Sequence, residues 1–487
     1  MKILMLTSEL APFSKVGGLA DMVSSLSKEM ADCGMDVKVI TPLYSSIKGK
    51  DTFDVKVPVL SVHMGLGVEK YCRVLSTSLA KAEVNFLEYD EYFDRAGIYN
   101  FGDISYTDNG ARYAFMCRAA LDFCRTQDWI PDVIHCHDWP AAYLPMYLNN
   151  NFIREPLGKA ASVFTIHNMQ HQGTFDKGVI EFAGLPQAVF NSSNCEHFGA
   201  FNLMKGAIYN STKISTVSPT YAKQIETAEY GCGLDSVIRF KSADIVGILN
   251  GVDLEEWHPS LDTFIAKNFT KDDLAGKFEC KKDLQETMGL AVDADIPVFG
   301  VIARLFDQKG LDLFANIARQ LLENYNIQIA ILGSGDKHLE YQLCEIAKLY
   351  PEKMAVEIAY NNKLSHQIEA GADFFVMPSR FEPCGLNQMY SMIYGTLPIV
   401  RNTGGLADTV DNYNQAEKTG CGFVFDEASE VALYNTIRWV IDTWYNRRED
   451  ILILQQNAMS KDFSWSKSSN AYRELYDWAI EERKKAF

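Results

Sequence analysis

Arg304, Lys309 and Glu382 in the second half of the chain have the types and the spacing to bind a phosphorylated sugar. Arg304 follows an apolar run at 298–303, and Lys309 stands five residues later, directly before Gly310 and a helical pattern. Two cations at a strand end and a helix start can hold a diphosphate, because both donate charge-assisted hydrogen bonds to its oxygens. For this spacing alone, a solvated surface pair is the alternative.

Glu382 lies in the loop 378–386, whose proline and glycine residues indicate a tight turn before a helix. The N-terminus of that helix favours an ionised carboxylate. Glu382 can therefore bind sugar hydroxyls or take part in catalysis, with an ordinary helix-capping role as the alternative. Cys384, two residues further on, is either a reactive thiol or a structural one.

The pentapeptide Gly-Gly-Leu-Ala-Asp occurs at 17–21 and again at 404–408. Each copy follows a strand-like run and opens a helix-like run. We therefore expect each to leave backbone N–H groups uncovered at the positive end of a helix dipole, where a phosphate binds well. Lys15 precedes the first copy and can reach a phosphate as a point charge. Two unrelated helix starts are the alternative, because paired glycines are common in turns.

Two polar residues in the first half of the chain, Asp138 and His167, also stand at the ends of apolar runs. In open α/β sheets ligands bind beyond the carboxyl ends of the strands, which makes both residues site candidates. A buried or capping histidine is the plainer interpretation of His167. His135 and His137 would share one face of a strand, but two histidines alone are a weak signal for a metal.

Short apolar runs alternate with helical patterns along the chain, which predicts parallel sheets covered by helices on both faces. The runs of the first half are 2–8, 37–41, 84–87, 132–136, 162–167, 213–217 and 246–249. Those of the second half are 298–303, 328–332, 355–358, 374–377, 397–400 and 422–425. A chain of 487 residues is too long for one core. We predict two doubly wound α/β domains that join near 253–259, with a helical tail from Ser464.

The composition is that of a globular protein with an excess of acidic residues. The 46 basic and 63 acidic residues give a formal net charge of −17, which argues against a general binder of nucleic acid or anionic membranes. No apolar stretch approaches the ~20 residues of a membrane span, and the start is too short for a signal peptide. The 11 scattered cysteines form no Cys-x-x-Cys pair. We expect reduced thiols, a cytoplasmic location and no metal site.

The order of these motifs resembles that of the bacterial glycogen synthase and plant starch synthase family of retaining glucosyltransferases. The resemblance runs from the first strand to the tail. It rests on the segments 15–21, 135–139, 164–168, 217–221, 249–253, 304–311, 379–386, 403–408 and 462–465. Each segment is weak alone, whereas together and in this order they are highly specific.

The resemblance implies a GT-B fold, in which two Rossmann-like domains face each other across a deep cleft and a C-terminal helix crosses back to the first domain. We expect an acceptor-side domain at 1–255, a nucleotide-sugar domain at 256–460 and the crossing helix at 461–487. The implied reaction is transfer of glucose, with retention, from ADP-glucose to the non-reducing end of an α-1,4-glucan such as glycogen or a maltooligosaccharide. No cofactor and no metal is expected, and domain closure would exclude water.

The functional positions of the family carry over to this chain by motif. By position, Arg304 and Lys309 would stabilise the leaving diphosphate, Glu382 would hold the donor sugar, and His167 and Asp138 would line the sugar site. The residues implied to contact substrate are Lys15, Gly17, Gly18, Asp21, Tyr99, Asn250, Tyr360, Cys384, Thr403, Gly404 and Gly405.

Wider relatives of this fold carry a second glutamate eight residues after the first, where this chain has Tyr390. Bacterial-type synthases resemble the chain in having tyrosine there, so a paired carboxylate is not expected. The alternatives are UDP-glucose as donor, a sucrose-type glucosyltransferase or nucleotide-sugar epimerase, and a catalytically silent glucan-binding regulatory protein. No particular oligomeric state is predicted.

Overall fold

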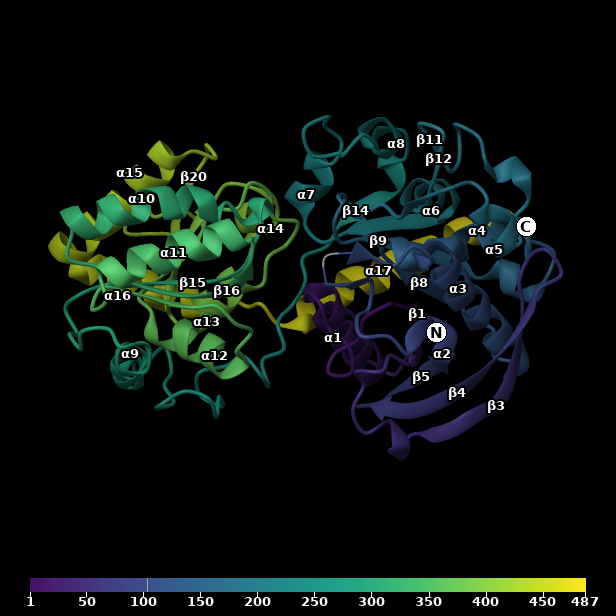
Figure 1. Ribbon diagram of the computed structural model, residues 1–487, viewed down its shortest axis with the longest axis horizontal. Coiled ribbons are helices and arrows are strands. Elements are labelled where there is room, and N and C mark those ends of the chain that lie inside the picture. Colours follow the sequence, from purple (N-terminus) through teal and green to yellow (C-terminus); the bar gives the residue numbers. More distant parts are fainter. Residues whose placement is uncertain (103) are drawn as a thin grey trace. The chain divides into compact units, whose positions relative to one another are not determined.

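The computed structural model describes residues 1–102 and 104–487. The chain forms two compact units, unit 1 (residues 1–251 and 465–487) and unit 2 (residues 252–464). The last helix, α17 (Trp465–Lys484), is drawn in yellow in Figure 1 and belongs to unit 1. The chain therefore passes from one unit to the other at 251/252 and again at 464/465, where the sequence placed boundaries at 255/256 and 460/461.

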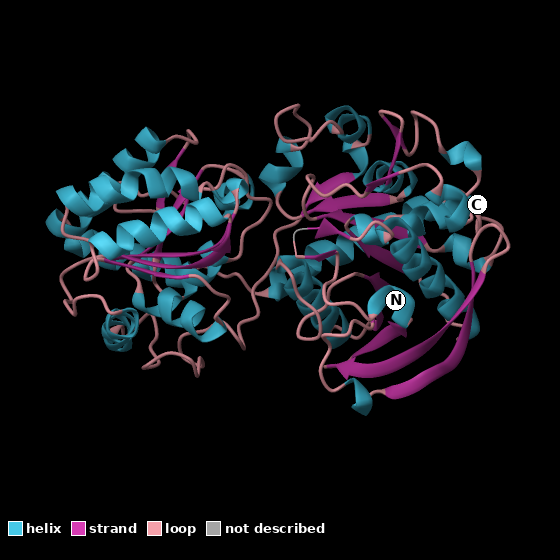
Figure 2. Ribbon diagram, viewed as in Figure 1, coloured by secondary structure: helices cyan, strands magenta, loops and turns pink. Residues whose placement is uncertain are grey.

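Unit 1 is built on a nine-stranded sheet in the order β14-β13-β9-β8-β1-β2-β5-β4-β3. Strands are drawn as magenta arrows in Figure 2. Its strands are β1 (Lys2–Leu6), β2 (Asp36–Pro42), β3 (Asp54–His63), β4 (Glu69–Leu79), β5 (Ala82–Glu88), β8 (Val133–His137), β9 (Ala161–Ile166), β13 (Lys213–Thr216) and β14 (Ile245–Gly247). Neighbouring strands are parallel, apart from the antiparallel pairs β3–β4 and β4–β5. The predicted parallel strands of this half are all confirmed.

The hairpin β3–β4 at the sheet edge is absent from the strands that the sequence predicted. Val57, Leu60 and Val62 of β3 are buried, whereas Val55 and Val59 are exposed. A strand covered on one face alternates apolar and polar residues, so it lacks the continuous apolar run by which the parallel strands are recognised. The prediction therefore included only the strands whose two faces are both covered by helices.

The helices of unit 1 connect and cover the strands. They are α1 (Gly18–Asp32), α2 (Asp90–Phe93), α3 (Asn109–Thr126), α4 (Tyr143–Asn150), α5 (Val179–Ala183), α6 (Leu203–Asn210), α7 (Pro219–Gln224), α8 (Asp235–Phe240) and α17. Two small sheets are added, β6 (Asn100–Phe101) with β7 (Ile104–Ser105), and β10 (Thr174–Phe175) and β11 (Glu196–His197) on either side of β12 (Ala200–Asn202). Helix α17 is held by the buried Tyr472 and Tyr476 and by Ser468, whose Oγ donates to the Leu249 carbonyl at 2.6 Å.

Unit 2 is built on a six-stranded parallel sheet in the order β17-β16-β15-β18-β19-β20. Its strands are β15 (Val298–Leu305), β16 (Gln328–Gly335), β17 (Met354–Glu357), β18 (Phe374–Met377), β19 (Leu397–Arg401) and β20 (Phe423–Phe425). Its helices are α9 (Ala275–Met288), α10 (Leu311–Asn324), α11 (Lys337–Leu349), α12 (Asn362–Gly371), α13 (Asn387–Ile393), α14 (Gly404–Thr409), α15 (Glu430–Asn446) and α16 (Arg448–Met459). All six predicted strands are present.

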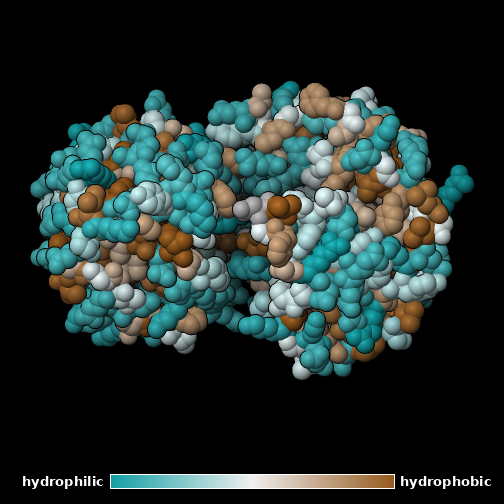
Figure 3. Space-filling model, in the orientation of Figure 1, coloured by the Kyte–Doolittle hydropathy of each residue, from teal (hydrophilic) through white to brown (hydrophobic). Residues whose placement is uncertain are grey.

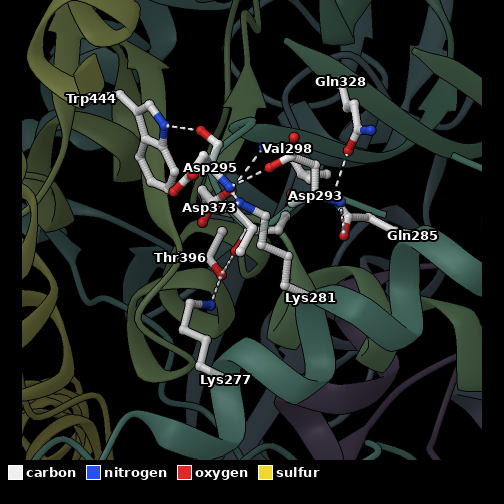
Figure 4. Close-up of polar contacts among 12 residues, drawn as sticks. Lys277, Lys281, Gln285, Asp293, Asp295, Val298, Gln328, Asp373, Thr396 and Trp444 are labelled. Atoms are coloured by element: carbon white, nitrogen blue, oxygen red, sulfur yellow. Dashed lines mark hydrogen bonds and ion pairs between the residues drawn. The ribbon is translucent and has the colours of Figure 1, made fainter. Parts of the chain in front are cut away.

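Buried lysines of α9 hold the amino end of this sheet (Figure 4). The Lys281 ammonium lies 2.8 Å from the Asp373 carboxylate, which also accepts a 2.8 Å hydrogen bond from the backbone N–H of Val298, the first residue of β15. Lys277 donates to Thr396 Oγ1 at 2.7 Å, and burial lowers the pKa of Lys277 to about 8. Because this network fixes the starts of the strands, the opposite, carboxyl end is left for polar groups with other roles.

The surface carries no large apolar face on the side drawn in Figure 3, where hydrophobic residues are scattered among hydrophilic ones. None of the helices in the described ranges combines the length and the hydropathy that a membrane crossing needs.

Candidate active site

Lys309 and Glu382 form an ion pair at the carboxyl end of the unit 2 sheet. After β15 a short 3₁₀ turn (Asp307–Lys309) brings Lys309 to the start of α10, and Glu382 lies in the loop between β18 and α13. The Lys309 Nζ is 2.6 Å from Glu382 Oε2, which also accepts a 3.1 Å hydrogen bond from Ser379 Oγ. Glu382 is only 5% exposed. The structure thus brings together two residues that the sequence placed 73 positions apart.

Further polar contacts fasten the Glu382 loop to the segment that carries Lys309. The Arg380 guanidinium donates two 2.7 Å hydrogen bonds to the two Asp312 carboxylate oxygens, and the Arg380 N–H donates to the Gln308 carbonyl at 2.9 Å. On the other side of the loop, Asn387 donates to the Ile302 carbonyl of β15 at 2.9 Å. Two-point arginine–carboxylate contacts fix both angle and distance. The cation and the carboxylate are therefore held in place before any ligand arrives.

The second glycine pair packs against the backbone of the same loop. The Gly405 N–H donates to the Glu382 carbonyl at 3.0 Å, and Gly404 has a φ of +46°, a conformation that favours glycine. A Cβ on Gly404 would lie 1.9 Å from the Glu382 carbonyl oxygen, and one on Gly405 would lie 2.0 Å from that of Cys384. These glycines are needed where they stand because the loop passes too close for any side chain.

The remaining candidates of unit 2 differ in accessibility. Arg304 lies inside β15, which continues two residues beyond the predicted strand, and its exposed guanidinium is 5.7 Å from the centre of the Phe306 ring. Within the described residues no hydrogen bond or ion pair joins Arg304 to a carboxylate. Tyr360 is 82% exposed, whereas Cys384 and Thr403 are buried. Arg304 and Tyr360 are therefore open to a ligand in a way that Cys384 is not.

Tyr390, at the position where wider relatives carry a second glutamate, takes part in an aromatic stack. Its ring lies 4.0 Å from that of Trp257 at an interplanar angle of 10°, and Trp257 stacks in turn on His366 at 3.9 Å. His366 is held by the Asp262 carboxylate, 2.7 Å from its Nδ1. This position therefore supplies packing of the segment after 252, and it adds no carboxylate to the site.

In unit 1, Asp138 and His167 lie at the carboxyl ends of the adjacent strands β8 and β9 and contact each other. The His167 N–H donates to Asp138 Oδ1 at 2.8 Å, and Asp138 has a φ of +56°, which is unusual for a residue with a side chain. Both residues keep part of their surface accessible. Burial among neighbouring groups raises the pKa of Asp138 to about 8 and lowers that of His167 to about 3. At neutral pH both side chains are therefore predominantly uncharged.

His135 and His137 share one face of β8, as predicted, with ring centres 4.1 Å apart. His135 contacts Tyr476 Oη at 2.9 Å and Thr165 Oγ1 at 2.5 Å, and His137 Nδ1 lies 3.2 Å from His167 Nε2. In the described part of the chain no three His, Cys, Asp or Glu residues are grouped to hold a metal ion. The expectation of a reaction without metal stays a prediction.

The first glycine pair is occupied by a protein carboxylate that the sequence analysis missed. Glu9 Oε2 accepts hydrogen bonds from the N–H groups of Val16 at 2.6 Å and Gly17 at 3.0 Å. The expectation that each copy leaves its N–H groups uncovered is therefore wrong for Gly17, as it is for Gly405 in the second copy. A Cβ on Gly17 would meet no atom within 4 Å, and Gly18, the exposed first residue of α1, follows it.

Tyr99 is the third partner of Glu9. Its hydroxyl donates to Glu9 Oε1 at 2.6 Å, and its carbonyl accepts a 2.8 Å hydrogen bond from Asn109 of α3. Lys15 Nζ lies 2.8 Å from the Asp21 carboxylate, and both side chains are partly exposed. A single glutamate after the first strand has no motif, so only the fold could reveal that it links Tyr99 to the glycine loop.

Asn250 is the last predicted contact in unit 1. It is 7% exposed, and its Oδ1 is buried with no hydrogen-bond partner within the described residues. A buried acceptor without a partner is uncommon in native proteins and asks for an explanation.

Comparison with known proteins places the whole chain in one family. The family model "Starch synthase catalytic domain" matches residues 2–240, and "Glycosyl transferases group 1" matches residues 289–453. Glycogen synthase 1 of Geobacter sulfurreducens is 46% identical over 99% of this chain and 97% of its own length. The chain belongs to the glycogen synthase and starch synthase family. It is thus a hexosyltransferase, as the sequence predicted.

Two further comparisons agree with this family assignment. Glycogen synthase of Treponema denticola is 42% identical over 99% of both chains. The catalytic domain of starch synthase IV from Arabidopsis thaliana, solved bound to ADP and acarbose, is 32% identical, covers 99% of both chains and superposes with a TM-score of 0.92. The family assignment confirms the predicted GT-B fold. A sucrose-phosphate synthase from Thermosynechococcus elongatus, 17% identical with a TM-score of 0.62, shares the fold alone.

Proposed function

We propose that this member of the glycogen synthase family transfers glucose from ADP-glucose to the non-reducing end of an α-1,4-glucan, with retention and without a metal ion. The observation that supports this best is the Lys309–Glu382 pair, held at 2.6 Å at the carboxyl end of a parallel sheet by loops that are tied to one another. Support for ADP as the nucleotide comes from the starch synthase relative that was solved with ADP and acarbose.

Unit 2 supplies the charges that departure of ADP requires. As the bond between the anomeric carbon and the phosphate breaks, negative charge grows on the diphosphate and positive charge on the sugar. Lys309 and the exposed Arg304 are the cations proposed for the first, and the Glu382 carboxylate is proposed for the second. Groups fixed beforehand need no rearrangement in the transition state, and removing one such group typically costs ~10²–10³ in turnover.

The state of Asp138 favours a front-face route to retention. A double-displacement route needs an ionised carboxylate as nucleophile. Asp138 is the carboxylate of unit 1 that the resemblance predicts at the sugar site, and burial raises its pKa to about 8, so it is mostly protonated at pH 7. In the proposed route the acceptor 4-hydroxyl attacks from the side that ADP leaves. Its oxygen bonds to the anomeric carbon, and its proton passes to the departing phosphate.

We also place the protein in the cytoplasm. All 11 cysteines are free thiols, and nine of the 11 are at least partly buried, which suits a reducing compartment. The predicted absence of nucleic-acid and membrane partners accords with the net charge of −17.

The test is nucleotide release by the purified full chain from ADP-glucose and from UDP-glucose, each with and without glycogen and with EDTA. We expect ADP release that depends on glycogen and is unchanged by EDTA, with slower release from UDP-glucose. Loss of release in EDTA would contradict the metal-free reaction. Glycogen binding without release of either nucleotide would show a silent binding protein.

Retention and the route are tested on the same system. The configuration of the new linkage follows from its cleavage by an enzyme specific for α-1,4 bonds. A glucosyl-enzyme adduct on Asp138, found by mass spectrometry after quenching, would contradict the front-face route.

The role of Lys309 is tested by Lys309→Ala, which should slow ADP release. Its matched control is Lys282→Ala, at an exposed lysine of α9, because both substitutions remove one ammonium group.

A further inference from the structure

His137 is a buried histidine of unit 1 that contacts His167, the residue that the family resemblance predicts at the sugar site. Its Nδ1 lies 3.2 Å from His167 Nε2, and its side chain has no exposed surface. His137 Nε2 is buried with no hydrogen-bond partner among residues 1–102 and 104–487. The pair therefore has one hydrogen bond between its two rings, and one buried ring nitrogen without a hydrogen-bond partner among the described residues.

The rings are uncharged, so each carries a single N–H. Burial lowers the pKa of both His137 and His167, and the proximity of His167 and His135 adds to the lowering for His137. In a neutral imidazole one nitrogen donates and the other accepts. The 3.2 Å contact can thus be made in two ways, with the shared proton carried either by His137 Nδ1 or by His167 Nε2.

The unpaired nitrogen decides between the two arrangements. If His167 Nε2 carried the shared proton, His137 would accept at Nδ1 and would hold its own proton on Nε2, as a buried N–H without an acceptor. If His137 Nδ1 carries it, the unpaired Nε2 is a bare acceptor. Orphaned buried N–H donors are the rarer and costlier defect in native proteins. The second arrangement is therefore favoured.

We propose that His137 is a positioning residue that fixes the tautomer of His167, so that His167 presents its Nδ1 as an N–H donor toward the substrate. His167 Nε2 is then the acceptor of the His137 Nδ1 proton, and the remaining nitrogen of His167 must carry the other proton. No hydrogen-bond partner for His167 Nδ1 is present among the described residues, and His167 is partly accessible.

This assignment rests on the proposed function and on the prediction from the sequence that His167 lines the sugar site. An N–H donor suits a sugar hydroxyl oxygen, and a bare nitrogen would suit a hydroxyl proton instead. The tautomer therefore determines whether His167 Nδ1 donates a hydrogen bond to a sugar hydroxyl or accepts one from it. The backbone of His167 is already fixed by Asp138 at 2.8 Å, so the ring proton is the remaining variable.

The direct test is nitrogen-15 NMR of the wild-type protein labelled at its histidines, at neutral pH and without substrate. The signals are assigned from single histidine substitutions. We expect a protonated Nδ1 and a bare Nε2 on both His137 and His167. A proton on His167 Nε2 would overturn the proposal, and this readout does not depend on any catalytic activity.

The kinetic test is a double-mutant cycle of H137L with H167A. H137L removes the shared proton, and we expect both His167 tautomers to become populated and kcat/KM for ADP-glucose to fall roughly tenfold, as for one lost hydrogen bond. H137N, whose amide nitrogen can take the place of Nδ1, should recover most of this loss. In the H167A background H137L should have no further effect.

The control for the cycle is Y476F, which removes the partner of the neighbouring buried His135 and leaves the His137–His167 contact intact. It should change neither the His167 tautomer nor kcat/KM. An equal loss from H137L with and without His167 would overturn the proposal, because His137 would then act elsewhere. If wild type transfers no glucose, the proposed function fails, while the NMR result still decides the tautomer.

Discussion

The two copies of Gly-Gly-Leu-Ala-Asp have one sequence and two different surroundings. In unit 1 the N–H groups of Val16 and Gly17 are bound by the side chain of Glu9, and the space beside Gly17 is open. In unit 2 the N–H of Gly405 is bound by the backbone carbonyl of Glu382, and both glycines touch the loop.

The two regions differ in which group of the glutamate, its carboxylate or its backbone carbonyl, binds the glycine loop. The Glu9 carboxylate accepts hydrogen bonds from the glycine loop and from Tyr99, so it acts as a structural acceptor. Glu382 uses its carbonyl for the glycine and keeps its carboxylate for Lys309. The same pentapeptide therefore binds the carboxylate of one glutamate and the backbone carbonyl of the other, and only in the second case is the carboxylate left for the proposed role in catalysis.

The largest effect is expected from Gly405→Ala. The new Cβ would lie 2.0 Å from the Cys384 carbonyl oxygen and must push the Glu382 loop away. A shift of about 1 Å at a reacting group can cost ~10²-fold in rate, and overpacking typically costs about 1–3 kcal/mol of stability. Turnover and thermal melting both measure this. A variant with wild-type turnover would show that the close packing of the second copy is not needed.

The lysines of the two regions, Lys309 beside Glu382 in unit 2 and Lys15 before the first copy in unit 1, should also differ in their effect on turnover. Lys309→Ala leaves the nearly buried Glu382 without its cation and removes a proposed diphosphate contact, so kcat should fall ~10²–10³-fold. Lys15→Ala removes a more exposed charge that is paired with Asp21, and we expect about tenfold or less. The measurement is steady-state ADP release. An equal loss of turnover in the two variants would contradict the proposed difference between the two regions.

Glu9→Ala should destabilise unit 1 by about 1–3 kcal/mol, because it removes the acceptor of the Val16 and Gly17 N–H groups and one partner of the Tyr99 hydroxyl. Glu9→Gln keeps an oxygen acceptor and should lose less. Urea unfolding followed by fluorescence gives both values. An equal cost for the two variants would mean that the charge of Glu9 matters, and not its role as acceptor.

Asp138→Asn tests the electrostatics of unit 1 through pH. The folded-state pKa of about 8 lies above the ordinary value of 3.8, so the unfolded chain releases the proton first as pH rises. The stabilisation that Asp138 contributes is therefore fully present below about pH 4 and is lost as pH rises to about 8. Asparagine cannot ionise, so the melting temperature of the variant relative to wild type should rise from pH 5 to pH 8.5. A constant difference would refute the raised pKa.

The smallest effect is expected from Gly17→Ala, the counterpart of Gly405→Ala. Its Cβ meets nothing within 4 Å, and its φ of −149° suits any residue. We expect a stability change within about 0.5 kcal/mol, measured by thermal melting. A loss of stability as large as that of Gly405→Ala would mean that both copies need a glycine for close packing.

The parallel core of both sheets could be predicted because its strands are continuous apolar runs, as in β18 (Phe374–Met377). The hairpin β3–β4 could not, since its exposed face breaks the pattern. Helix α9 was also missed. Its inward face carries Lys277 and Lys281, which read as solvated charges until Thr396 and Asp373 are seen beside them.

The candidate site was predictable to the extent that its residues follow strands. Glu382 and Lys309 were found this way, and the fold added the contact between them. Glu9 and His137 were not among the predicted site residues. Each contacts a predicted site residue that is close to it only in space, Tyr99 for Glu9 and His167 for His137.

Helix α17 has a consequence for the order in which a ribosome would deliver the parts of this molecule. Unit 2 is complete once Ser464 has been made, whereas unit 1, whose first residues are made earliest, still lacks Trp465–Phe487. Until those residues emerge, the ring nitrogen of His135 that contacts Tyr476 and the sheet surface under Tyr472 are uncovered. The half of the protein that is synthesised first is therefore the half that finishes folding last.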